Sequence, residues 1–305
     1  MAFSASESAF EGFRIIRREP ATMAVWGLLL LLITFASSAA LMPVMRDFTS
    51  SITTGAAGNP SAQLANFAKL GQVELIVLPV YLALLSVFTA AVYRTVLRPE
   101  DKGLARLKLG ADELRMAGLF VLLWLLAVAA GLAVILVAAV CVGGLALAFR
   151  SAPAAAAIGI IIIYLLVLAA YAWIGVRLSF AGPMTFTQRK IRVFAAWPLT
   201  KGRFWPLLGC YVLAWVFMIL LVLVELVISG VLTLGASGGS FSRAATAMFR
   251  PDLASMNLLS PIYLVRLVVG AVFGVVMWTV ALAAPAAAYK AIAAPRPEDQ
   301  AETFS

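Results

Sequence analysis

The chain has 305 residues, of which 63% are hydrophobic and only 12% are charged, and its mean hydropathy is +1.02. A soluble domain has about 45–50% apolar and about 25% charged residues, so this composition excludes a water-soluble globule. The formal net charge is +9 and histidine is absent, which removes imidazole bases, haem ligands and most zinc sites. We therefore expect an all-α, polytopic transmembrane helical bundle that needs no metal or other cofactor.

The first 20 residues are predicted to form an amphipathic helix on the cytoplasmic surface of the membrane. Ser4 followed by Glu7 fits a capping box, in which the two side chains bond free backbone N–H groups of the first turn. Apolar and basic side chains follow at helical spacing, which is typical of a helix that lies in the interface plane. The apolar positions are Phe10, Phe13 and Ile16, and the basic positions are Arg14, Arg17 and Arg18.

Residues 21–292 contain six apolar segments long enough to cross a bilayer, which requires about 20 residues. A short cytoplasmic tail, residues 293–305, follows them. The third segment is longer than a hydrocarbon core of about 30 Å requires, so we expect either a break at Gly143 and Gly144 or a projecting helix. The predicted spans are about 21–42, 73–92, 116–149, 155–174, 204–234 and 261–289.

Basic residues lie mainly on one side of this predicted topology. Seventeen Lys and Arg residues fall in the amino-terminal segment, the loops after the second and fourth spans, and the tail, whereas five fall on the other side. Since Lys and Arg are enriched in cytoplasmic loops, both termini should be cytoplasmic. The high alanine content favours a bacterial inner membrane as the location.

Three similar units are expected along the chain, over residues 3–97, 98–182 and 183–292. Each would consist of an amphipathic interfacial segment followed by two spans, and the segments before the third and fifth spans would cover about 100–114 and 185–203. Repeats of this kind are common in transporters, whose binding sites lie between the repeats. The alternative is an ordinary series of membrane hairpins with basic inner loops, which has the same appearance.

Residues 177–215 (RLSFAGPMTFTQRKIRVFAAWPLTKGRFWPLLGCYVLAW) contain a recognisable pattern. An Arg-apolar-Ser step is followed by a small residue and proline, a basic stretch, and the run Trp-Pro-Leu-Thr-Lys-Gly-Arg-Phe-Trp. This pattern resembles the membrane domain found beside glycerophosphoryl diester phosphodiesterases and related YciC-like, six-span bacterial membrane proteins. The resemblance implies a lipid-associated membrane module without the soluble hydrolase domain and its metal ligands, and it implies no activity.

Two ionisable residues fall inside predicted spans. Glu225 lies well inside the fifth span and Arg266 lies five residues into the sixth, so both should lie toward the outer side, with Glu74 nearby in the second span. Such residues cost about 2.5–3.5 kcal/mol on insertion scales and are functional by default. We therefore hypothesise a polar site among spans 2, 5 and 6. The alternative is a structural Glu225–Arg266 ion pair, or an arginine that extends to the interface.

The loop between the fourth and fifth spans contains basic and aromatic residues but no acid between positions 177 and 203. Basic residues attract anionic head groups by about 1 kcal/mol each near the surface, and aromatic residues settle at the interface. We expect contacts with anionic lipid here, unless these residues only set the topology. Nucleic acid is not expected as a partner, because the topology already explains the charge. The predicted contact residues are Arg189, Lys190, Arg192, Lys201, Arg203, Trp197 and Trp205.

The motifs of common enzyme classes are missing. No Walker loop, HExxH, GxSxG or DxD-type metal pair occurs, so we expect no enzyme, a membrane-embedded lipid enzyme included. The chain is predicted to bind or transport a lipid or other amphiphile through the polar site. The alternative function is a scaffold or accessory subunit that organises a protein partner, or a homo-oligomer, through the basic segments. A polar, water-filled cavity would separate the two functions, because only a transporter needs one.

Overall fold

Six long apolar helices dominate the structure. The computed structural model describes residues 4–53, 60–101, 103–249 and 257–293. Within these ranges every regular element is a helix, and six helices are long and apolar enough to cross a membrane. They are α2 (Pro20–Thr53), α3 (Pro60–Leu97), α4 (Ala111–Ala148), α5 (Pro153–Leu178), α8 (Phe204–Ala236) and α10 (Pro261–Ala293). The predicted all-α class and six spans are confirmed, and the chain is a multi-pass membrane protein. The predicted tail lies outside the described residues except for Ala293.

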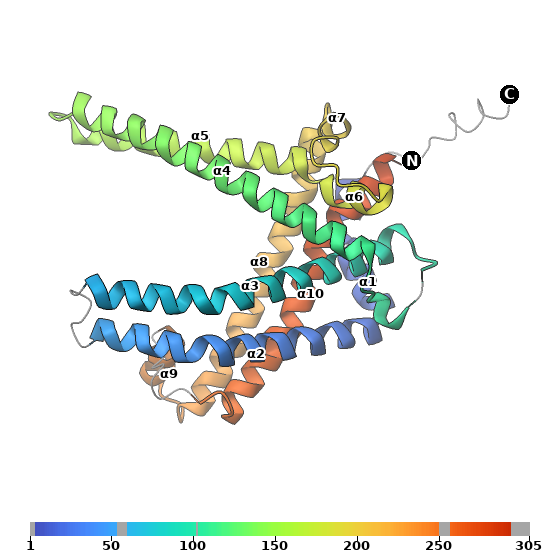
Figure 1. Cartoon of the computed structure of the whole chain (residues 1–305), viewed down its shortest axis with the longest axis horizontal. Coiled ribbons are helices and arrows are strands. Elements are labelled where there is room, and N and C mark those ends of the chain that lie inside the picture. The colour runs from blue at the N-terminus through green and yellow to red at the C-terminus, as the bar shows by residue number, and fades with distance from the viewer. Residues whose placement is uncertain (1–3, 54–59, 102, 250–256, 294–305) are drawn as a thin grey trace.

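Three helix pairs diverge from a common end of the molecule (Figure 1). The α2–α3 and α4–α5 pairs extend away from this end, and α8 and α10 run across them in this view. Helix α10 is central, since it contacts α1, α2, α3, α6 and α8. The shorter helices are α1 (Ala5–Arg18), α6 (Ala181–Gln188), α7 (Ala196–Thr200) and α9 (Phe241–Phe249).

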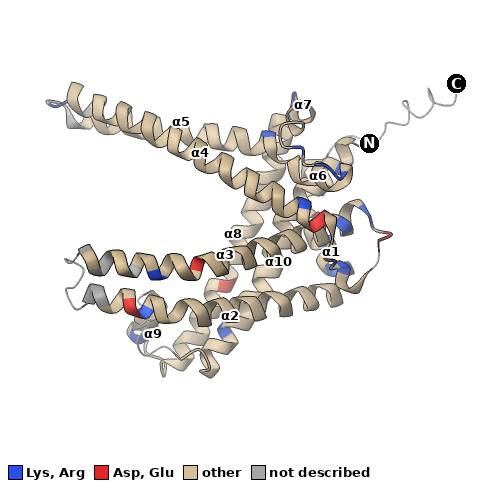
Figure 2. Cartoon of the chain, viewed as in Figure 1, with Lys and Arg blue, Asp and Glu red and all other residues tan. Residues whose placement is uncertain are grey.

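The common end is also where basic residues gather, as Figure 2 shows. We call the end that holds α1, α6 and α7 the basic end, and the opposite end, which holds α9, the far end. The buried core lies at the basic end, where Trp26, Tyr93, Phe180 and Phe186 are all at most 4% exposed. In contrast, the most apolar windows of α4 and α5 contain no buried residue, so these helices present apolar side chains outward, as lipid-facing helices do.

Helix α1 begins where the sequence predicts and packs into the bundle. The Ser4 hydroxyl accepts a hydrogen bond from the Glu7 N–H at 3.4 Å, which confirms the Ser4 half of the predicted capping box. At Gly12 the helix contacts α10 so closely that a β-carbon there would lie 2.5 Å from the Val280 Cα. Phe10 packs against Phe217 of α8 with the two rings tilted and their centroids 4.7 Å apart. The helix is therefore held by α8 and α10 as well as by its amphipathic character.

Helix α4 is continuous through Gly143 and Gly144, so the break that we considered there does not occur. Its 38 residues would extend about 57 Å at 1.5 Å per residue, which exceeds a hydrocarbon core of about 30 Å. The helix therefore either tilts strongly or projects from the bilayer.

The segment before α4 differs from its prediction. In place of a helix over 100–114, the described residues there form a single 3-10 turn at Leu104–Arg106, and α4 begins at Ala111. Tertiary hydrogen bonds hold this turn: the Trp26 indole N–H donates to the Ala105 carbonyl at 2.9 Å, and Ala105 itself has a left-handed φ of 47°. The predicted amphipathic segment over 185–203 forms two short helices, α6 and α7, instead of one.

A buried ion pair joins the end of α3 to the first turn of α4. The Arg94 side chain is 2% exposed and the Glu113 side chain 6%, and the Arg94 guanidinium donates to both the Glu113 carboxylate and the Arg106 carbonyl. Arg106 in turn donates through Nε to both carboxylate oxygens of Glu19, at 3.0 and 3.1 Å. Arg94 and Arg106, which we counted only as charges that set the topology, therefore also hold the fold together.

Each of the three expected units ends its second span with a basic residue that contacts a neighbouring unit. Arg94 of the first unit binds Glu113 of the second, and Arg177 of the second lies over the Trp197 ring of the third, 5.7 Å from its centroid. Lys290 of the third unit donates to the Val96 carbonyl of the first at 2.8 Å. The contacts form a closed ring, which fits a repeat, although the threefold repeat stays a prediction.

Replacing Arg94 by Met is expected to lower the free energy of unfolding by about 3–5 kcal/mol, because Glu113 loses its partner while it remains buried. Adding Glu113→Gln should restore part of this loss, since no unpaired charge then remains. Chemical unfolding in mild detergent, followed by far-ultraviolet circular dichroism, measures the three variants.

The control is Arg14→Met, which breaks the exposed Arg14–Glu11 pair on α1 and should cost under about 1 kcal/mol. A double variant no more stable than Arg94→Met alone would contradict the importance of the buried pair.

Candidate functional site

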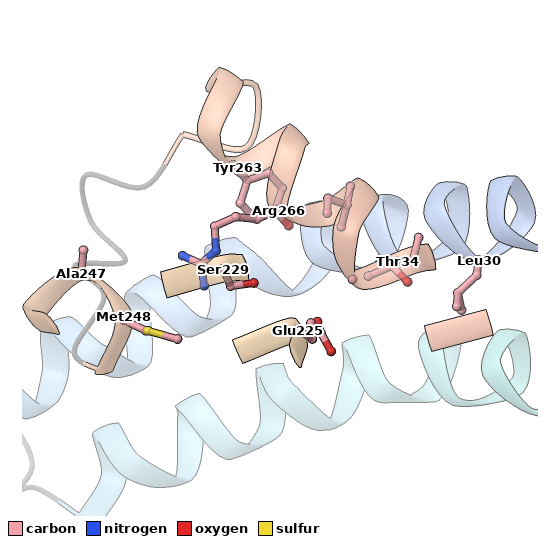
Figure 3. Close-up of a pocket in the computed structure, with 11 residues that line it drawn as sticks. Leu30, Thr34, Glu225, Ser229, Ala247, Met248, Tyr263 and Arg266 are labelled. Atoms are coloured by element: carbon pink, nitrogen blue, oxygen red, sulfur yellow. The ribbon is translucent and has the colours of Figure 1, made fainter. Parts of the chain in front are cut away.

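A cavity of about 400 Å³ lies toward the far end, between α2, α8, α9 and α10 (Figure 3). Polar side chains line it from three of these helices, and small and aliphatic residues complete the walls. The polar residues are Thr34 of α2, Glu225 and Ser229 of α8, and Tyr263 and Arg266 of α10. We call this space the polar cavity.

Helix periodicity explains how the charged residues reach the polar cavity. Glu225 and Ser229 are four residues apart on α8 and therefore share one face. Arg266 and Gly270 have the same spacing on α10, which packs against α8. A β-carbon on Gly270 would lie 3.6 Å from Glu225 Oε1, which is an ordinary contact distance, so the Glu225 carboxylate lies beside α10 at this position.

Glu225 and Arg266 both line the polar cavity, but they do not bond to each other. Their positions along the fifth and sixth spans predicted that both would lie toward the outer side. Among the hydrogen bonds and ion pairs of the described residues, none involves either side chain. In Figure 3 the Arg266 guanidinium reaches toward Ser229, one turn of α8 away from Glu225. The structural ion pair that we considered is therefore not formed.

Glu74 does not belong to the polar cavity. It is exposed on α3 and is not among the residues that line this space. The position beside the far half of α10 is taken by Leu30 and Thr34 of α2. The polar cavity thus lies among the first, fifth and sixth spans, and a role for Glu74 of the second span stays a prediction.

Five of the seven predicted lipid-contact residues are exposed at the basic end. Arg189, Lys190, Arg192 and Lys201 are exposed, and Trp205 is 77% exposed. No acidic residue interrupts this segment of the sequence. We call these five residues the basic surface.

The other two predicted contact residues are less accessible. Trp197 packs edge-on against Trp173, with ring centroids 5.0 Å apart, and the Arg177 guanidinium lies over both rings. Arg203 is half-buried next to the start of α8. Trp197 therefore joins α7 to α5, which is a packing role that the loop sequence did not reveal.

Sequence reasoning missed the tertiary partners of the inner charges. Arg98, which we counted only for topology, donates to Asp112 at 3.2 Å and to the Phe186 carbonyl at 2.9 Å. It also lies 4.6 Å from the Phe186 ring centroid. The sequence contained one signal for this network. Arg94 and Arg98 end the second apolar segment, and the acids Asp112 and Glu113 come just before the third.

No protein-family model, curated protein or solved structure matches the chain. The resemblance to the membrane domain beside glycerophosphoryl diester phosphodiesterases thus rests on the 177–215 pattern, and family membership stays a prediction. Within the described residues there is no group of three or more acidic or thiol side chains placed to hold a metal ion.

Because Glu225 and Arg266 are not paired, Glu225→Gln and Arg266→Met break no ion pair and each remove an uncompensated charge, so neither should lower the free energy of unfolding. The double variant should show the sum of the two effects within about 0.5 kcal/mol. Chemical unfolding in detergent measures all three variants, and a coupling above about 1 kcal/mol would show that the two side chains do pair.

Proposed function

We propose that the chain is a non-enzymatic membrane protein that binds or transports a lipid or other amphiphile in the polar cavity. The observation that supports this function is the Arg266 guanidinium, which lines a cavity between spans without a side-chain partner among the described residues. A charge at such depth costs about 2.5–3.5 kcal/mol on insertion scales. An anionic group of a ligand would offset that cost.

The donor set of the cavity supports binding more than catalysis. A hydroxyl nucleophile needs a base within hydrogen-bond reach. Ser229 and Thr34 line the cavity, but neither hydroxyl bonds to Glu225 in this arrangement. A cavity with one guanidinium, one carboxylate and several hydroxyls is suited to hold a polar head group.

We place both termini on the cytoplasmic side of a bacterial inner membrane. Basic residues gather at the end that holds α1, α6 and α7 (Figure 2), and such residues are enriched on the cytoplasmic side. The polar cavity then lies in the outer half of the bilayer, because Arg266 is near the start of α10 at the far end.

Arg266→Met is expected to weaken binding of a phospholipid by about tenfold, because a charge-assisted contact to the phosphate is lost. Native mass spectrometry of the detergent-purified protein, titrated with phosphatidylethanolamine and phosphatidylglycerol, measures the bound fraction. The control is Arg243→Met, which removes an exposed arginine of α9 that does not line the cavity. Equal lipid binding by wild type and Arg266→Met would contradict the proposed function.

The basic surface favours a second interaction, with anionic lipid at the membrane surface. Glutamine substitutions at Arg189, Lys190, Arg192 and Lys201 should reduce the enrichment of phosphatidylglycerol over phosphatidylcholine on the purified protein, since each charge contributes about 1 kcal/mol. Raising the salt concentration should reduce the enrichment on the wild type in the same direction. Lipid adducts counted by native mass spectrometry measure both effects.

A charge-matched control replaces four basic residues toward the far end by Gln: Arg46, Lys69, Arg150 and Arg243. This variant should keep the phosphatidylglycerol enrichment. The alternative function is a scaffold that binds a protein partner or a second copy through the basic surface. In that case substitution of the basic surface would leave the lipid enrichment unchanged and reduce partner binding or self-association.

A further inference from the structure

A second, apolar cavity of about 570 Å³ lies next to the polar cavity. Its walls come from α2, α3, α4 and α10, and its side chains are almost all aliphatic or aromatic, among them Phe88, Trp124 and Trp278. Leu30 of α2 lines both cavities. We call the second space the apolar cavity, and only the Leu30 side chain is shared between the two linings.

A row of residues on α10 connects the two cavities. Arg266, Gly270, Gly274 and Trp278 follow one another at four-residue spacing, so successive members are neighbours, and the row winds about 120° around the helix from Arg266 to Trp278. Arg266 and Gly270 line the polar cavity, and Trp278 lines the apolar cavity. Gly274 lies between them under Leu30, since its β-carbon would be 2.9 Å from Leu30 Cδ2.

The distance along α10 from Arg266 to Trp278 fits a lipid in one leaflet. Twelve residues separate Arg266 from Trp278 on α10, which corresponds to about 18 Å at 1.5 Å per residue. Half of a hydrocarbon core of about 30 Å is about 15 Å. A head group at Arg266 would therefore place its hydrocarbon tail beside Leu30 and Trp278.

The charges of the polar cavity select among head groups. Glu225 and Arg266 have opposite charges and no partners among the described side chains, so a ligand with both charges would satisfy both. A purely anionic head group would satisfy Arg266 but place its charge near the Glu225 carboxylate, which disfavours it.

We propose that the ligand is a zwitterionic phospholipid whose phosphate binds Arg266, whose ammonium binds Glu225, and whose tail passes Leu30 into the apolar cavity. This inference rests on the proposed function, because it requires a lipid in the polar cavity. It adds the charge type of the head group and the path of the tail.

The head-group part is tested with phosphatidylethanolamine and phosphatidylglycerol that have identical acyl chains. The test uses the variant with glutamine at Arg189, Lys190, Arg192 and Lys201, in which the basic surface no longer attracts phosphatidylglycerol. Native mass spectrometry should show this variant binding phosphatidylethanolamine about tenfold more tightly, and adding Glu225→Gln should abolish that preference. Adding Arg266→Met should weaken both lipids. If the glutamine variant binds both lipids equally and Arg266→Met weakens both, the proposed function stands and the zwitterionic ligand is wrong.

The tail part is tested by closing the passage between the two cavities. Leu30→Trp should weaken both lipids about tenfold without changing their ratio, because the larger ring fills the space that the tail needs. The control is Leu28→Trp, at a position on the same helix that is 57% exposed and lines neither cavity, and it should bind as the wild type does. Unchanged binding in Leu30→Trp would overturn the tail path.

A second measurement covers the case in which Leu30→Trp does not fold. Phosphatidylethanolamine with brominated acyl chains, added in equimolar amount to protein in unbrominated detergent, should quench tryptophan fluorescence. Trp278→Phe should remove a larger part of this quenching than Trp205→Phe, because Trp205 is exposed at the basic end. Equal losses in the two variants would overturn the tail path and leave the head-group result unaffected.

Discussion

The structure depends on a charge pair that is buried where the second span ends and the third begins. Arg94 and Glu113 are almost completely removed from solvent, so each needs the other to offset the loss of hydration. The pair fixes the position of α4 relative to α3, and Arg106 extends the network to Glu19 at the start of α2. Side-chain hydrogen bonds therefore organise the ends of three spans, which apolar packing in a membrane alone would leave weakly defined.

The helices pack tightly at the basic end and diverge toward the far end. Arg94, Arg177 and Lys290 each contact a neighbouring unit at the basic end, and the buried aromatic core lies there as well. Toward the far end the helices diverge, and the polar cavity occupies the space between α2, α8, α9 and α10. The polar cavity and the tightly packed basic end thus lie at different depths of the same bundle.

Helix α10 extends from the tightly packed basic end to the polar cavity. Its basic-end half contains Val280, which contacts α1 at Gly12, and its far half contains Arg266 and two glycines. The glycines are a GxxxG step, a pattern that usually brings two helices together. Here Gly274 makes room for Leu30, and Gly270 lies beside the Glu225 carboxylate at an ordinary contact distance. Gly274 therefore sets the position of Leu30, which lines both cavities.

The sequence by itself determined the all-α class, the six spans and the cap at Ser4, because hydropathy, segment length and capping are local properties. It also placed Glu225 and Arg266 at similar depth, since depth follows from position along a span. Only the tertiary structure decided the partner of Arg94, the turn at Ala105 and the exclusion of Glu74 from the cavity. These features depend on which helix faces lie together, and helix rotation and crossing are set by contacts between segments far apart in the chain.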